Sequence, residues 1–256
     1  MKKLTLQFAL LLFATFFAQT VIAKCQVIDR VPATITKSGN YCLNQTLESQ
    51  QDSGPAILVL ANNVNLNLRG HSLSNRLASD GFCLNANADD PTIGIQVVAA
   101  TNVRIRNGQL HCFRTGVRIN GSDPNCNDCS YGNSVQNLTV NTSYAKGIFV
   151  RGSQTVIKNN HIVNTGGARE TVPAGIHMIG SGNTVKNNDV MDVRGRNATG
   201  IITAVGFANL VVNNRVQQSE YGFRLFGGNA VRYRDNLTAG VDFAYFGQGQ
   251  DLGNND

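Results

Sequence analysis

The chain has 256 residues, of which 42% are hydrophobic and 15% charged, so it suits one large folded domain and not a disordered chain. Its 26 glycines, 5 prolines and lack of tryptophan favour many short strands with tight turns over long helices. The net charge of +6 includes two lysines in the first 23 residues. The surplus suits an acidic partner and is too small and dispersed to indicate nucleic-acid binding.

Residues 1–23 have the pattern of a secretory signal peptide. Lys2 and Lys3 precede an apolar run from Phe8 to Phe17, and a cleavage site follows at Ala23. No later stretch is long and apolar enough to cross a membrane. We therefore predict a secreted or periplasmic protein that begins at Lys24 and has no transmembrane segment.

Six cysteines follow the signal, and an exported chain is free to form disulfides. The predicted pairs are Cys25 with Cys42, Cys83 with Cys112, and Cys126 with Cys129. The spacing of the last pair also occurs in redox and metal sites, but here no second such pair and no nearby histidine accompanies it. We expect structural disulfides, no metal site and no cofactor.

The sequence contains an internal repeat in which a glycine precedes alternating apolar residues. The pattern starts at Gly94, Gly116, Gly147, Gly175, Gly200, Gly222 and Gly240. A second element recurs inside the modules and ends at Gly108, Asn160, Asn188 and Asn214. Glycine and asparagine tolerate a left-handed backbone best, so we expect these four residues to have positive φ.

Each module therefore predicts three short strands separated by bends, with no room for a helix. Stacking of such modules gives a parallel β-helix with columns of inward apolar residues and of hydrogen-bonded asparagines. We expect an N-terminal cap at 24–55, the β-helix at 56–246 and a C-terminal tail at 247–256.

The glycine starts and Asn-Asn bends resemble those of the right-handed parallel β-helix superfamily of pectate-lyase-like, carbohydrate-binding and sugar-hydrolase-type repeat proteins. That superfamily includes lyases, hydrolases, epimerases, phage tailspikes, NosD-like proteins and members without known catalysis. The resemblance implies the all-β right-handed fold and leaves the activity open. The motifs of polygalacturonases and the calcium-binding acids of pectate lyases do not occur.

Side chains alternate along a strand, so the residue two places after each starting glycine is expected to face outward. The predicted row is Gln96, Arg118, Phe149, His177, Ile202, Arg224 and Asp242, and a parallel row is Val98, Asn120, Arg151, Ile179, Ala204, Phe226 and Ala244. Arginines can fork onto carboxylates and aromatic rings can stack on sugars. The two rows therefore predict a groove for an acidic polysaccharide or oligosaccharide.

Within this groove we assign candidate roles. His177 is the candidate base of a β-eliminating lyase, and Arg151 and Arg224 are the candidate ligands of the uronate carboxylate. The candidate substrate-binding residues are Arg118, Phe149, Phe226, Asp242 and, from the loop at 191–199, Arg194 and Arg196. A second loop at 164–174 is expected to add Arg169 and Glu170.

Two alternatives to a lyase remain open. Hydrolysis requires two carboxyl groups at the scissile bond, and Asp242 is the single acid in the two rows, so a hydrolase is disfavoured. A non-catalytic glycan-binding or surface-interaction solenoid requires the same rows without a base. An enclosed ionisable group with a shifted pKa would favour the enzyme.

Overall fold

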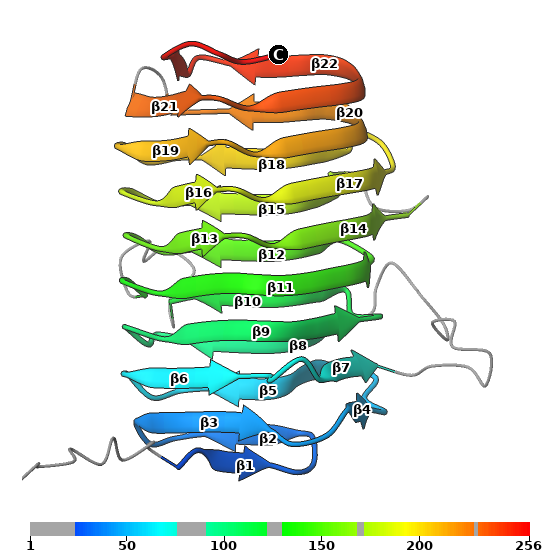
Figure 1. The fold of residues 1–256 in the computed structure, drawn as a ribbon, viewed down its shortest axis with the longest axis vertical. Helices are drawn as coiled ribbons and strands as arrows, with labels where there is room; N and C mark the ends of the chain where they lie inside the picture. The colour runs from blue at the N-terminus through cyan, green and yellow to red at the C-terminus, as the bar shows by residue number, and fades with distance from the viewer. Residues whose placement is uncertain (1–23, 76–90, 122–129, 168–171, 228–229) are drawn as a thin grey trace, which may run out of the picture.

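The computed structural model describes residues 24–75, 91–121, 130–167, 172–227 and 230–256. These residues form parallel strands stacked in successive coils from the N-terminal to the C-terminal end (Figure 1). No helix occurs among them, so none of them forms a helix that could span a membrane. The fold is the predicted right-handed parallel β-helix.

Each coil contributes one strand to each of three faces. Face 1 contains β2 (Ala33–Ile35), β5 (Gly54–Val59), β8 (Thr92–Val98), β10 (Thr115–Asn120), β12 (Lys146–Arg151), β15 (Ala174–Ile179), β18 (Thr199–Ala204) and the second halves of β20 (Arg215–Leu225) and β22 (Leu237–Gly247). This face carries the strands that the starting glycines predict.

Faces 2 and 3 complete each coil. Face 2 contains β1 (Gln26–Ile28), β3 (Gly39–Leu43), β6 (Val64–Asn67), the first halves of β9 (Arg104–His111) and β11 (Ser134–Ser143), β13 (Val156–Lys158), β16 (Thr184–Lys186), β19 (Asn209–Val212), β21 (Val231–Arg234) and β23 (Gln250–Asp251). Face 3 contains β4 (Leu47–Ser49), β7 (Ser72–Asn75), the second halves of β9 and β11, β14 (His161–Gly166), β17 (Asp189–Arg194) and the first halves of β20 and β22.

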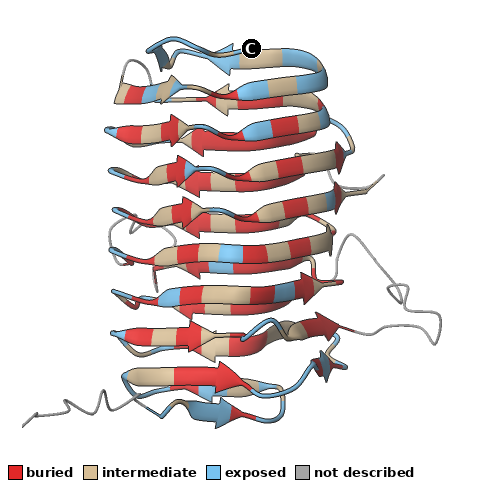
Figure 2. Ribbon diagram, viewed as in Figure 1, coloured by how far each residue is buried: buried red, intermediate tan, exposed pale blue. Residues whose placement is uncertain are grey.

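The core consists of inward columns of apolar side chains, one from each face. On face 1 the column is Ile57, Ile95, Val117, Ile148, Ile176, Ile201 and Phe223, all fully buried and each paired with the next. Figure 2 shows the resulting alternation of buried and more exposed residues along the strands. Burial of apolar surface along the whole axis stabilises the coils.

The starting glycines form a column because the coils approach closely there. A Cβ on any of the six glycines from Gly94 to Gly222 would lie 2.6 to 2.8 Å from a backbone oxygen of the next coil. The column continues at Ala244, whose oxygen approaches Gly222, and does not continue at the predicted Gly240. Gly240 has a φ of +62° and lies beside Gln218 in the preceding bend.

The asparagine column is confirmed, but the predicted position of the positive φ is wrong by one residue. Asn107, Asn159, Asn187 and Asn213 have φ between 51° and 59°, and each precedes one of the four predicted residues. The first residue of the pair makes the bend, which turns the second inward. Asn160, Asn188 and Asn214 are therefore buried.

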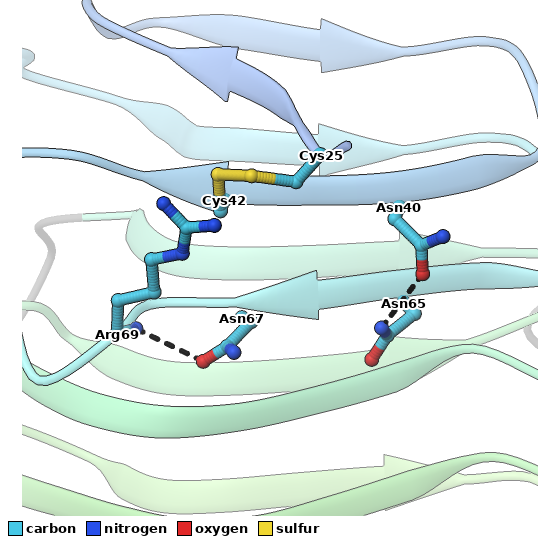
Figure 3. The surroundings of a disulfide bond; sticks show 6 residues. All are labelled: Cys25, Asn40, Cys42, Asn65, Asn67 and Arg69. Atoms are coloured by element: carbon cyan, nitrogen blue, oxygen red, sulfur yellow. Dashed lines mark hydrogen bonds between the residues drawn. A yellow bond between two sulfur atoms is a disulfide. The ribbon is translucent and has the colours of Figure 1, made fainter. Parts of the chain in front are cut away.

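The N-terminal end is closed by β1 to β4, which pair in parallel with strands of the same sheet. The predicted disulfide between Cys25 and Cys42 is confirmed, with the two Cα atoms 5.8 Å apart. It joins β3 to the residue before β1, close to a hydrogen bond of 2.8 Å from Asn65 to Asn40 (Figure 3). The 24–55 boundary of the cap stays a prediction.

The other predicted disulfides reach beyond the described residues. Cys112 is disulfide-bonded and 4% exposed. Its predicted partner Cys83, and the predicted pair of Cys126 and Cys129, lie outside the described ranges. Their pairing stays a prediction.

Candidate functional site on face 1

The strand register brings most of the predicted row together on the outside of face 1. Gln96 pairs with Arg118, and the row continues through Phe149, His177, Ile202 and Arg224 in successive coils. Neighbouring strands in a sheet lie about 4.8 Å apart, so His177 and Arg224, two coils apart, are separated by about 10 Å of the axis. The predicted order is confirmed for these six residues.

The predicted place of Asp242 in the row is wrong, because Phe246 pairs with Arg224 and occupies the next place. The cause is the bend at Gly240, which delays the start of the last face 1 strand by four residues. Asp242 is exposed and precedes Phe243, which pairs with Tyr221.

The second predicted row is confirmed in part. Val98 pairs with Asn120, and Arg151, Ile179 and Ala204 pair in turn. The backbone N–H of Phe226 donates to the oxygen of Thr203, so Phe226 follows one residue beyond the paired part of β18 and β20. Ala244 does not continue this row, because it lies opposite Gly222.

His177 lies among three cations. Burial lowers the pKa of its imidazole to about 4, and the charges of Lys146, Arg151 and Arg224 contribute to the same shift. Its ring meets the ring of Phe149 edge-on, with centroids 5.4 Å apart. Within the described part of the chain, its buried Nδ1 has no hydrogen-bond partner. The side chain is therefore neutral at pH 7 in a positively charged environment.

Arg224 is enclosed by aromatic rings. Its Cζ lies 4.9 Å from the ring centroid of Tyr221, 5.3 Å from that of Phe226 and 5.8 Å from that of Phe246. The buried Nε of Arg224 has no hydrogen-bond partner in the described ranges. The rings hold the guanidinium by cation–π contacts and leave its in-plane Nε–H available to another acceptor.

Arg118 extends the positive region by one coil beyond Phe149. Its Cζ lies 5.7 Å from the centroid of the Phe149 ring. Burial and, to a lesser extent, the charge of Arg151 lower the pKa of the Arg118 guanidinium. An acidic ligand at this place would relieve the repulsion between the two arginines.

The loop residues contribute less than predicted. Arg194 and Arg196 are exposed near the turn between β17 and β18, and the Nε of Arg194 donates to Oδ1 of Asp192. No contact joins either arginine to the outward row in the described residues. Arg169 and Glu170 lie outside those residues.

Sequence reasoning missed the row formed by the residues that precede the starting glycines. Lys146 and Tyr221 belong to this row, and Phe243 follows Tyr221 in the next coil. Lys146 Nζ donates to the backbone oxygen of Val172, and its charge acts on His177. The sequence signal that could have revealed this row is a cationic or aromatic residue directly before a starting glycine, as Lys146 is before Gly147 and Tyr221 before Gly222.

The described residues offer no metal centre. They contain no group of three or more His, Cys, Asp or Glu side chains that could hold a metal ion. His161 Nδ1 lies 3.1 Å from Asp189 Oδ2, and Asp189 also accepts two hydrogen bonds from Arg215. This cluster is satisfied on face 3 without a metal.

The structure is similar to several solved β-helix proteins. The catalytic domain of a GH87 alpha-1,3-glucanase in complex with nigerose is 11% identical, with a TM-score of 0.40, and the match covers 91% of this chain and 63% of the glucanase chain. A tailspike protein of E. coli bacteriophage HK620 is 12% identical, with a TM-score of 0.41, and the match covers 82% of this chain and 50% of the tailspike chain. This chain thus spans less than two thirds of the length of these chains. A search of curated proteins gave no significant match.

Residues 61–237, well over half of the chain, match the family described as "Periplasmic copper-binding protein (NosD)". The described residues contain no group of three or more His, Cys, Asp or Glu side chains that could hold a copper ion. Among the usual copper ligands, His177 is surrounded by cations that would repel the metal, and Met178 is buried in the core. On the strength of the matched repeat and the fold it forms, the chain belongs to the NosD family.

Proposed function

We propose that this protein is exported and binds an acidic polysaccharide along face 1. The signal pattern at 1–23 and the disulfide between Cys25 and Cys42 support export. The observation that carries the binding proposal is that His177 Nδ1 and Arg224 Nε are buried on the outward row without hydrogen-bond partners in the described residues. Buried polar groups without partners are costly, and a ligand carboxylate would satisfy the arginine.

The charges and rings of the row fit a glycan with regular carboxylates. Arg118, Arg151 and Arg224 supply cations in different coils, and Phe149 and Phe226 supply ring surfaces in the coils of Arg151 and Arg224. A uronate polymer presents carboxylates and sugar faces in alternation. We therefore favour it over a neutral polymer or a nucleic acid as the ligand of this face.

The binding test uses the mature chain and polygalacturonate, alginate and hyaluronan, with dextran as the neutral polymer. We expect binding to at least one acidic polymer, weakened at least tenfold in Arg224→Gln and Arg151→Gln. Arg232→Gln is the matched control, because Arg232 is exposed on β21 of face 2. Failure of all three acidic polymers, or equal affinity of all variants, contradicts the proposal.

A second candidate function is β-elimination, because the only histidine of the row stands among cations that could stabilise an enolate-like anion. With a pKa of about 4 the imidazole of His177 is neutral at pH 7 but a weak base, and the negative charge of a bound uronate would raise this pKa. In this reaction the base removes the proton beside the carboxylate, its electron pair forms a C=C bond, and the glycosidic C–O bond breaks. The leaving oxygen takes a proton from water, and Arg151 and Arg224 would stabilise the enolate-like anion.

Absorbance of the unsaturated uronate product distinguishes the lyase from a binding solenoid. We expect product from the polymer that binds, and His177→Ala is expected to abolish its formation while leaving binding within a few fold. Binding without product supports the non-catalytic solenoid. Reducing ends without absorbance would indicate hydrolysis instead.

A further inference from the structure

A hollow of about 550 Å³ lies at the corner between face 1 and face 2, in the turns that connect the two faces. We call it the corner groove. Its lining residues are Tyr131, Ser153, Gln154, Ser181, Gly182, Phe207 and Ala208. They come from four successive coils, which are linked here by contacts between neighbouring turns. Tyr131 forms a parallel β-bridge with Ser153, the N–H of Ser181 donates to Oγ of Ser153, and the N–H of Phe207 donates to Oγ of Ser181.

A glycine column keeps side chains away from this corner. A Cβ on Gly152, Gly180 or Gly206 would lie 2.2 to 2.3 Å from a backbone oxygen of the preceding turn. These three positions therefore accept only glycine without a backbone shift. The turns stay shallow there, and the hollow extends across several coils.

Two exposed aromatic rings stand at opposite ends of the corner groove. Tyr131 is 52% exposed and Phe207 is 70% exposed. Three strand spacings separate their coils, which amounts to about 14 Å along the axis. Large exposed rings beside a hollow are unfavourable in water unless a ligand covers them. The separation suits an oligosaccharide and exceeds a single sugar.

The surface of the groove is mostly apolar, with a few polar groups between the rings. Among the described residues, no lining residue is Asp, Glu, Lys, Arg or His. Ser181 Oγ accepts a hydrogen bond of 3.2 Å from Phe207 N–H, which leaves the hydroxyl proton available as a donor. The exposed side chain of Gln154 adds an amide with both donor and acceptor atoms. A charged ligand would find no counter-charge among the described lining residues, and a sugar, unlike a lipid chain, would both stack on the rings and hydrogen-bond to Ser181 and Gln154.

We propose that the corner groove binds a neutral oligosaccharide of several sugar units. Tyr131 and Phe207 stack on sugar rings towards its two ends, and Ser181 and Gln154 hydrogen-bond to its hydroxyl groups between them. The chemistry is opposite to that of face 1, where cations select an acidic polymer. This site is independent of the proposed function.

Isothermal titration of the full mature chain with cellohexaose, maltohexaose, laminarihexaose and mannohexaose tests the proposal. We expect at least one hexasaccharide to bind, and Phe207→Ala and Tyr131→Ala each to weaken it at least tenfold. Phe246→Ala is the matched control, because Phe246 is 48% exposed but lies on face 1. Its affinity for the hexasaccharide is expected to equal that of the parent chain.

Phe207→Trp gives an independent readout, because the chain contains no other tryptophan. We expect this variant to keep its affinity and to change its fluorescence on saturation with the same hexasaccharide. Unchanged polygalacturonate binding by Phe207→Ala would separate this groove from face 1. The proposal is overturned if no hexasaccharide binds, if the alanine variants bind as well as the parent, or if the groove binds only detergent or peptide.

Discussion

Asn188 donates its side-chain amide to Oδ1 of Asn214 at 3.0 Å, and Oδ1 of Asn214 also accepts the backbone N–H of Asn188. The same pair of bonds joins Asn160 to Asn188 and Asn214 to Asn236. Each buried amide therefore satisfies both its own side chain and the backbone of the neighbouring coil. This ladder holds the bend between face 2 and face 3 in register.

Asn188→Ala is expected to lower the free energy of unfolding by about 3 kcal/mol, because it leaves several buried groups of two coils without partners. Asn187→Gly is the control. Asn187 has a φ of 56°, which glycine adopts freely, and its side chain makes an exposed bond to Asn213. Urea unfolding of both variants checks the difference, and equal losses would contradict the ladder's role.

The pKa of His177 predicts how stability depends on pH. Its folded pKa of about 4 lies below the ordinary histidine value of 6.5, so between these pH values the unfolded chain binds a proton that the folded chain does not. The free energy of unfolding is expected to fall as the pH is lowered from 6.5 to about 4. In His177→Gln this loss should be smaller. Unfolding measured at pH 7 and pH 5 tests this, and parallel curves for both proteins would refute it.

Gly200→Ala tests the close approach of the coils. The added Cβ would lie 2.2 Å from Cγ1 of Val216 and 2.8 Å from the oxygen of Gly222, so we expect a loss of about 2 to 3 kcal/mol in stability. Gly167→Ala should be neutral, because no atom of the described residues lies within 4 Å of its Cβ position. The denaturation midpoints of the two variants provide the comparison.

The corrected register makes opposite predictions for two residues of β22. Phe246 contacts Arg224 on the outward row, so Phe246→Ala is expected to weaken binding of the acidic polymer severalfold. Asp242→Ala should leave this binding unchanged or slightly stronger, because it removes an exposed negative charge away from the row. Affinity electrophoresis measures the binding of both variants. A loss of polymer binding in Asp242→Ala would contradict the placement of Asp242 away from the row.

The repeat made the fold and most of the row predictable from sequence. Each starting glycine fits closely against the next coil and is followed by an inward apolar residue. This repeat fixes which residue of each strand faces outward, so the order of residues such as Phe149 and His177 along the axis could be predicted. The prediction failed where two roles of glycine look alike in sequence. Gly240 makes a bend with positive φ, whereas Ala244 holds the position of close approach.

The surroundings of the row could not be predicted. Alternation along a strand shows to which face a side chain points, but not which other side chains surround it. That Phe246 joins Tyr221 and Phe226 around Arg224 depends on the register of the last coil. The corner groove was missed for a similar reason. Tyr131 and Phe207 lie far apart in sequence, and the glycines that recur in these turns, Gly152, Gly180 and Gly206, indicate close packing and do not reveal a hollow beside it.

The asparagine ladder also has a direction. The Nδ2 of each amide from Asn160 to Asn236 donates to the next asparagine of the ladder, the last donation goes to Oδ1 of Asn255, and Asn255 donates to the carboxylate of Asp251. The same Nδ2 also donates to a backbone oxygen of the preceding coil. Each amide thus joins three successive coils, and the chain of side-chain bonds ends on the negative charge of Asp251.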